Sequence, residues 1–129
     1  MIMADTTFFV AIFVDNDQWH EKALKISDYV ENKEKIITNQ IISETITMIC
    51  NKVGAKESKR IYDYLIDNCT IINETREMYD KSMDTLLKYN CKLSLADATS
   101  IEIMKKLKIH EIASFDSDFD NKEGIIRIH

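Results

Sequence analysis

The sequence contains no proline, only two glycines and only three cysteines among its 129 residues. Without a stretch rich in proline and glycine, no flexible linker or domain boundary is visible, and residues 1–129 are expected to form a single domain. The cysteines are too few and too scattered for a disulfide framework or a zinc site. We therefore expect reduced and partly buried thiols at Cys50, Cys69 and Cys91.

Long hydrophobic runs are also missing. The longest apolar run near the start, Phe8 to Val14, is too short to span a bilayer, and no basic leader or cleavage site accompanies it. We expect a cytoplasmic protein that does not enter a membrane.

A basic excess is absent too, since the formal net charge is -5. This charge disfavours a simple nucleic-acid-coating protein but says little about a nuclease, because metal-binding carboxylates count as negative until their cations bind.

Hydrophobic residues make up 45% of the chain and charged residues 30%, which is typical of a globular protein with a core. Short apolar runs alternate with segments of helical period. Strands are predicted at Ile2–Asp5, Lys35–Thr38, Cys69–Ile72, Glu111–Phe115 and Ile125–Ile128. Helices are predicted at Thr7–Val14, Gln18–Asn32, Gln40–Asn51, Lys56–Asp67, Glu74–Tyr89 and Leu95–Leu107.

Short strands separated by helices predict βαβ units. The expected fold is α/β, with three αβα layers around a central parallel sheet of four to five short strands. Ligands of such sheets gather outside the carboxyl ends of the strands. If the chain reverses direction after the third strand, the first and fourth strands flank the point where ligands bind.

Two acidic residues stand at those strand ends. Asp5 closes the first strand and Asp116 closes the fourth. Each has a purely structural alternative, because Asp5 could cap the following helix and Asp116 could form an Asx-turn in a polar loop. Taken singly, neither residue establishes a site.

Glu44 is placed on one helix face with Ile41, three residues before it, and Met48, four residues after it. A carboxylate within an apolar stripe is costly unless a cation or donors meet it, although a salt bridge remains the alternative. Asp97 follows Ser94 in the S-x-x-[DE] pattern of a capping box. Asp97 therefore gains functional weight only as one of a set of four acids.

Five short segments carry these residues: Asp5-Thr6-Thr7, Asp17-Gln18-Trp19-His20-Glu21-Lys22-Ala23, Ser43-Glu44-Thr45, Leu95-Ala96-Asp97-Ala98 and Ser114-Phe115-Asp116-Ser117-Asp118-Phe119. Their order and spacing resemble those of a PIN domain, and size and layout are close to the VapC-type toxins of toxin–antitoxin pairs. The resemblance runs from about residue 2 to residue 128.

This resemblance implies a site in which four acids hold Mg²⁺ or Mn²⁺: Asp5, Glu44, Asp97 and Asp116. Thr7 and Ser114 match hydroxyl positions that orient the carboxylates or the attacking water. Asp118 stands where many members carry another residue, so it is assigned a supporting place only. His20 is implied to be a packing or capping residue. Without metal, clustered carboxylates repel, so at least one is expected to have a raised pKa.

The implied activity is that of an endoribonuclease that hydrolyses RNA phosphodiester bonds with metal-activated water, leaving a 5′-phosphate and a 3′-hydroxyl. Hard divalent ions suit such oxygen ligands. A toxin role, a homodimer and an antitoxin partner are further expectations from the resemblance. A housekeeping RNA-processing nuclease remains an alternative, as does a non-catalytic module that binds RNA or a partner.

A basic stretch is a weaker candidate for RNA contact. It comprises Lys52, Lys56, Lys59 and Arg60, which could follow a phosphate backbone or form a solvated face.

Three other families are disfavoured by single positions. A haloacid-dehalogenase-like phosphatase needs Asp-x-Asp where this chain has Asp5-Thr6-Thr7, and a receiver domain needs an acid where Asn73 stands. An EF-hand starting at Asp116 needs glycine where Asn121 stands and glutamate where Arg127 stands.

Overall fold

A single parallel sheet of five strands organises the molecule, whose computed structural model describes all residues, 1–129. Its strands are β1 (Ile2–Ala4), β2 (Lys35–Thr38), β3 (Cys69–Ile72), β4 (Glu111–Ala113) and β5 (Ile126–Ile128). Their order across the sheet is β3-β2-β1-β4-β5. The chain therefore reverses direction after β3, and β1 lies beside β4 with Ala4 opposite Ala113. The expected switch point between the first and fourth strands is confirmed.

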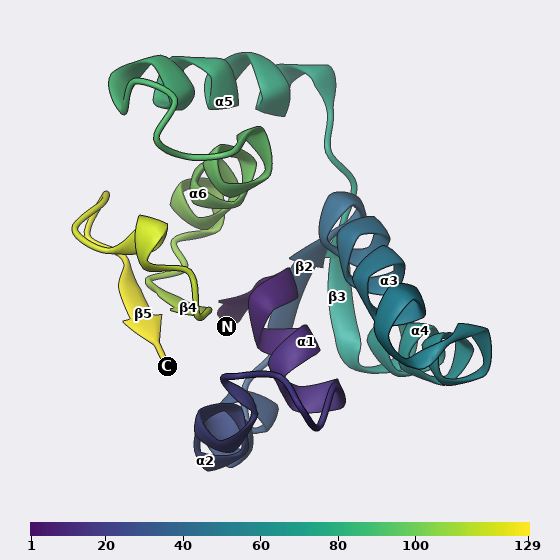
Figure 1. Ribbon diagram of the computed structural model, residues 1–129. Coiled ribbons are helices and arrows are strands. Elements are labelled where there is room, and N and C mark those ends of the chain that lie inside the picture. Colours follow the sequence, from purple (N-terminus) through teal and green to yellow (C-terminus); the bar gives the residue numbers. More distant parts are fainter.

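Six helices cover the sheet: α1 (Thr6–Phe13), α2 (His20–Glu31), α3 (Asn39–Val53), α4 (Ala55–Asn68), α5 (Arg76–Lys88) and α6 (Leu95–Leu107). Right-handed crossovers place the helices before the reversal on one face and those after it on the other. Figure 1 shows α2 and α6 on opposite sides of β1 and β4, with α5 outside α6. The expected three-layer αβα fold is confirmed.

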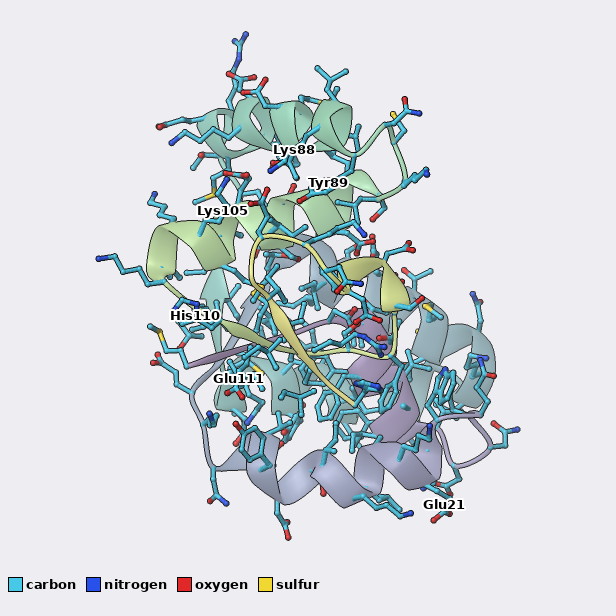
Figure 2. All side chains as sticks on the ribbon, turned by 90° about the vertical axis from the view of Figure 1, so that its left-hand side faces the viewer. Glu21, Lys88, Tyr89, Lys105, His110 and Glu111 are labelled. Carbon is cyan, nitrogen blue, oxygen red and sulfur yellow. The ribbon has the colours of Figure 1, made fainter.

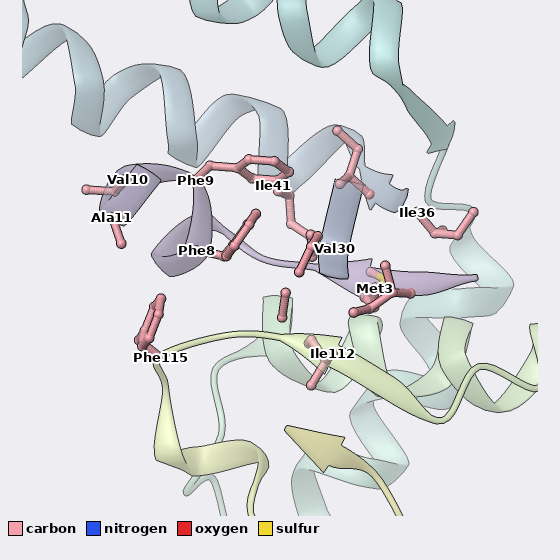
Figure 3. Close-up of a cluster of buried hydrophobic side chains, with 14 of the residues drawn as sticks. Met3, Phe8, Phe9, Val10, Ala11, Val30, Ile36, Ile41, Ile112 and Phe115 are labelled. Carbon is pink, nitrogen blue, oxygen red and sulfur yellow. The ribbon is translucent and has the colours of Figure 1, made fainter. Parts of the chain in front are cut away.

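The core lies between these layers and is centred on β1. Ile2, Met3 and Ala4 are fully buried, as expected for a central strand covered on both faces. Phe8 and Phe9 of α1 meet edge to face and pack in the same cluster, as Figure 3 shows. The first strand and first helix are thus fixed by apolar packing, and the residue between them, Asp5, is held at a defined place.

All the predicted element bounds agree with the structure to within two residues, and β2, β3 and α6 agree at both ends. The predicted strand Glu111–Phe115 is two residues too long, because β4 ends at Ala113. The side chain of Ser114 bonds the amide of Asp116, and the amide of Phe115 bonds Thr7, so the chain turns away there. The 3₁₀ turn η1 (Ser117–Phe119) was not predicted.

The cysteines are all free, as expected, but the prediction of partly buried thiols is wrong for two of them. Only Cys69 is half-buried, whereas Cys50 and Cys91 are exposed. Cys50 lies near the end of α3, and Cys91 lies in the turn after α5. None of the helices combines the length and the hydrophobicity that a membrane crossing requires.

Candidate metal centre

A pocket of about 360 Å³ opens at the carboxyl edge of the sheet, between α1, α3, α6 and the loop that follows β4. No lysine, arginine or histidine lines it. Its five carboxylates are Asp5, Glu44, Asp97, Asp116 and Asp118. The structure therefore brings the four acids expected from the sequence, and Asp118 with them, to one place.

Asp5 follows β1 and is the N-cap of α1. It also lines the pocket, so its capping role does not exclude a role in the site. Its Oδ1 accepts hydrogen bonds from the Phe8 amide at 3.2 Å and from the Thr7 hydroxyl at 2.6 Å. Its Oδ2 accepts one from the Ser114 hydroxyl at 2.6 Å. Burial raises the pKa of this carboxyl to about 6, although these three donors act to lower it, and Asp116 adds a smaller raising effect.

The two hydroxyls that hold Asp5 also join α1 to the end of β4. Thr7 Oγ1 accepts a hydrogen bond from the Phe115 amide at 2.8 Å, and Ser114 Oγ accepts one from the Asp116 amide at 3.0 Å. Because each hydroxyl has a single proton and both protons point to Asp5, the hydroxyl rotors are fixed. This pattern fits the orienting role that the resemblance implies for Thr7 and Ser114.

Asp97 lies in the first turn of α6. The Ser94 side chain caps this helix by accepting a hydrogen bond from the Asp97 amide at 3.0 Å, as the capping-box pattern predicts. The carboxylate of Asp97 nevertheless lines the pocket. Its pKa is raised to about 7, mainly by burial, with smaller contributions from the charges of Asp116 and Asp5. The expectation of a raised pKa is confirmed, with burial as the larger cause and repulsion as the smaller.

Asp116 and Asp118 lie on the loop after β4. The Asp118 amide donates to Asp116 Oδ1 at 2.9 Å, which is the Asx-type cap expected as an alternative for Asp116. One ligand atom from each of Asp97, Asp116 and Asp118 lies within 4.8 Å of the other two. These three oxygens could surround one cation, so Asp118 is placed more centrally than the sequence suggested.

Glu44 is the member of the set whose surroundings differ from the prediction. It shares a helix face with Ile41 and Met48, and all three line the pocket. The face is not a buried apolar stripe, however, because Glu44 is exposed and Met48 is 42% exposed. The buried residues of α3 are Ile41, Thr45 and Ile49, which form the helix face adjacent to the one that carries Glu44. The argument from desolvation therefore does not apply to Glu44.

Two threonines that the sequence analysis did not assign connect Glu44 to the body of the protein. The buried Thr45 hydroxyl donates to Thr6 Oγ1 at 3.1 Å, and the Thr6 hydroxyl approaches Glu44 Oε2 at 3.4 Å. Thr6 comes from α1 and Thr45 from α3. Both stand next to assigned residues, in Asp5-Thr6-Thr7 and Ser43-Glu44-Thr45, but only the packing of the two helices reveals their contact.

The remaining expected residues lie outside the pocket. His20 Nδ1 lies 2.7 Å from the Ala11 carbonyl, in keeping with a packing role. Lys59 pairs with Asp63, and Arg60 with Glu57, on the surface of α4. Neither these two nor Lys52 and Lys56 line the acidic pocket. Contact of the basic stretch with RNA stays a prediction.

Chemically, the pocket offers oxygen donors alone. Carboxylate oxygens are preferred by hard divalent ions, of which Mg²⁺ requires few protein ligands because it keeps several waters. Calcium loops, by comparison, draw six to eight oxygens from one continuous segment. Here the oxygens come from four separate elements: the end of β1, α3, α6 and the loop after β4.

Comparison with known proteins identifies the family. The PIN-domain family model matches residues 2–125. A curated relative in two strains of Mycobacterium tuberculosis, 23S rRNA-specific endonuclease VapC20, is 24% identical over 122 residues, which cover 92% of either chain.

Solved structures give the same assignment for the fold. The crystal structure of M. tuberculosis VapC20, described as a sarcin–ricin loop cleaving toxin, superposes with a TM-score of 0.81 at 22% identity over 92% of both chains. A toxin–antitoxin complex from Klebsiella pneumoniae gives a TM-score of 0.73 at 16% identity, over 100% of this chain and 98% of that one. The resemblance noted in the sequence is confirmed, and this chain belongs to the PIN-domain family.

Proposed function

We propose that the protein is a divalent-metal-dependent endoribonuclease, the toxin of a toxin–antitoxin pair. One observation carries the proposal: five carboxylates from four separate elements line one pocket that has no basic side chain in its lining. Uncompensated carboxylates held together are unfavourable unless a cation joins them. Membership of the PIN-domain family supports the same reading.

The donor set fits Mg²⁺ or Mn²⁺. Asp97, Asp116 and Asp118 would hold the ion from one side, since their ligand atoms lie within 4.8 Å of one another. Asp5 and Glu44 would complete the site from β1 and α3. When bound, such an ion activates water and neutralises charge on the scissile phosphate.

The chain's own residues prepare the pocket for that ion and for RNA. Thr7 and Ser114 keep both oxygens of Asp5 oriented. The buried hydroxyl pair of Thr6 and Thr45 limits the movement of Glu44. Because its pKa is raised to about 7, Asp97 is partly protonated at neutral pH in the metal-free protein, and a bound cation would displace that proton. These roles rest on geometry and are part of the proposal.

Support for RNA as substrate comes from a relative, since the M. tuberculosis protein is named for cleavage of 23S rRNA. Support for an antitoxin partner comes from the K. pneumoniae complex.

A homodimer belongs to the proposal as well. Two apolar side chains on α5 are available for such an interface: Met83 is 45% exposed and Leu87 is 70% exposed. We place the activity in the cytoplasm, where RNA substrates are present.

The direct test is cleavage of a structured RNA panel with Mg²⁺, with Mn²⁺ and with EDTA. We expect cleavage with metal and none with EDTA. Asp97→Asn removes one charge without changing volume, so it should abolish cleavage while the protein stays folded by circular dichroism. Asp80→Asn on the exposed face of α5 is the matched control and should cut like the wild type.

Cleavage by Asp97→Asn at the full rate would exclude the assigned role of Asp97. Metal-independent cleavage would exclude the proposed chemistry. Absence of any cleavage by the wild type, together with tight RNA binding, would favour the non-catalytic alternative.

A further inference from the structure

The connection between β4 and β5 is unusual for a parallel pair of strands. Parallel neighbours need a long crossover, which is usually an α-helix, but residues 114–125 contain only the short turn η1. This segment, which we call the acidic loop, carries Asp116 and Asp118 into the pocket. The contacts that join this segment to other elements therefore affect where the two carboxylates lie.

Arg127 on β5 provides such a contact. Its Nε and Nη2 donate to the two carboxylate oxygens of Asp120, at 2.8 and 3.0 Å, and its Nη1 donates to the Ser114 carbonyl at 3.3 Å. One guanidinium thus joins both ends of the segment 114–120 to the sheet. Only 11% of the Arg127 side chain is exposed, against 42% of Asp120. The planar fork suits this geometry, which a lysine cannot reproduce.

The residues between these two ends are the ones that face the pocket. The Asp120 amide donates to the Ser117 carbonyl, and the Asp118 amide donates to Asp116 Oδ1, so hydrogen bonds connect the segment from Asp116 to Asp120. Phe119, fully buried, anchors the middle of the turn in the core. Movement of Asp120 would therefore change the position of both Asp116 and Asp118.

A second contact fixes the far end of the acidic loop to a different element. Glu123 accepts hydrogen bonds from Lys88 at 2.8 Å and from the Tyr89 hydroxyl at 3.3 Å. Figure 2 shows Lys88 and Tyr89 near the junction of α5 and α6, away from Glu111 at the start of β4. This contact lies after the turn that carries the acids, so it offers a control within the same loop.

We propose that Arg127 and Asp120 form a clamp that positions Asp116 and Asp118 for cation binding, so that the third acid of the run Asp116-Ser117-Asp118-Phe119-Asp120 is an anchor and not a ligand. The inference rests on the proposed function for the identity of the cation, but the clamp itself rests on the contacts above. Arg127 is a positioning residue in this account, because it acts through Asp120 and Ser114.

The test measures Mn²⁺ affinity by calorimetry and amide hydrogen exchange in the full chain, below the melting temperature of each variant. Arg127→Met should raise the Mn²⁺ dissociation constant roughly tenfold to a hundredfold, as is typical for the loss of a partner behind a metal ligand. The amides of Asp118 and Asp120 should exchange faster. Arg127→Lys should give an intermediate affinity. Asp120→Asn should weaken binding less than Arg127→Met, because Arg127 keeps its contact with the Ser114 carbonyl, and the double variant should bind no more weakly than Arg127→Met.

Two controls separate positioning from general loosening. Arg76→Met removes an exposed arginine at the start of α5, and Glu123→Gln weakens the other anchor of the acidic loop. Both should bind Mn²⁺ like the wild type. An equal loss of affinity in Glu123→Gln, or wild-type affinity and exchange in Arg127→Met, would overturn the clamp, even if the melting temperature fell. If the wild type bound no Mn²⁺, the proposed function would fail, and amide exchange alone would still decide the clamp.

Discussion

Asp5 is only 7% exposed, and its carboxylate accepts hydrogen bonds from three donors, two on α1 and one after β4. Those donors limit the cost of burial but do not remove it, which is why the pKa still rises to about 6. Asp97 has fewer donors and two acidic neighbours, and its pKa rises to about 7. The metal-free protein therefore holds two carboxylates in surroundings that favour their protonated forms.

Stability of the metal-free protein should consequently depend on pH in a defined direction. The ordinary pKa of an aspartate is 3.8, whereas in the folded protein the pKa is about 6 for Asp5 and about 7 for Asp97. Between pH 3.8 and pH 7, the folded state therefore binds more protons than the unfolded state. The free energy of unfolding should fall as pH rises through this range. Asp97→Asn should remove part of the fall, roughly 2–3 kcal/mol between about pH 5 and about pH 8.

Urea unfolding in the presence of a chelator, at several pH values, measures this difference. Equal pH dependence for the wild type and Asp97→Asn would show that Asp97 is not held in an unfavourable ionised state.

At the scale of elements, helix caps do two jobs in this protein. Ser94 caps α6 and at the same time fixes the first turn that carries Asp97. Thr75 caps α5 through the Met78 amide in the same way, but no pocket acid lies on that helix. Both caps accept one amide hydrogen bond from the residue three positions on, but only the helix of Ser94 presents an acid to the pocket.

Replacement of each cap by alanine should separate these effects. Ser94→Ala and Thr75→Ala should each lower the free energy of unfolding by about 1 kcal/mol. Only Ser94→Ala should also weaken Mn²⁺ binding, since its helix presents Asp97 to the pocket. Chemical denaturation and calorimetric titration give the two quantities. Equal Mn²⁺ affinity in both variants would show that the cap does not orient the site.

The elements also indicate what the sequence could predict. The bounds of α6 were predictable because Ser94 begins the helix by a local rule, and Lys108 ends it in the left-handed conformation. The end of β4 was not, because Ser114 and Phe115 continue a strand-like pattern and turn only through contacts with residues of α1.

The same distinction applies to the candidate site. Its acids could be found because each stands at a strand end or in a short segment of recognisable type. The hydroxyl pair of Thr6 and Thr45 and the clamp of Arg127 on Asp120 could not be found, since each joins residues from different elements. The exposure of Glu44 could not be predicted from the local sequence either, because it depends on which face of α3 packs against α1.

For the whole molecule, the reversal of chain direction after β3 creates the pocket. It brings β1 and β4 side by side, so that the residues after both strands meet at one edge between the two helical layers (Figure 1). α3 and α6 then approach this edge from opposite faces of the sheet. The carboxylates repel one another across the elements, and a cation would join those elements.

Divalent ions should therefore stabilise the entire fold. At a concentration about a hundredfold above the dissociation constant, Mn²⁺ or Mg²⁺ should add about 2.7 kcal/mol, or a rise in melting temperature of about 10 °C. The transition should stay single, because we propose that residues 1–129 unfold as one unit. Calorimetry with and without metal checks both points. Two separate transitions would contradict the single unit.

The central claim is that these acids share a divalent ion, and the most direct measurement is a calorimetric titration of Mn²⁺ into the metal-free wild type and into Asp97→Asn at neutral pH. The account predicts saturable binding by the wild type with release of protons, and affinity at least tenfold weaker for Asp97→Asn, because it removes one of three clustered ligands. Binding of equal strength by both proteins, or no binding by either, would contradict it.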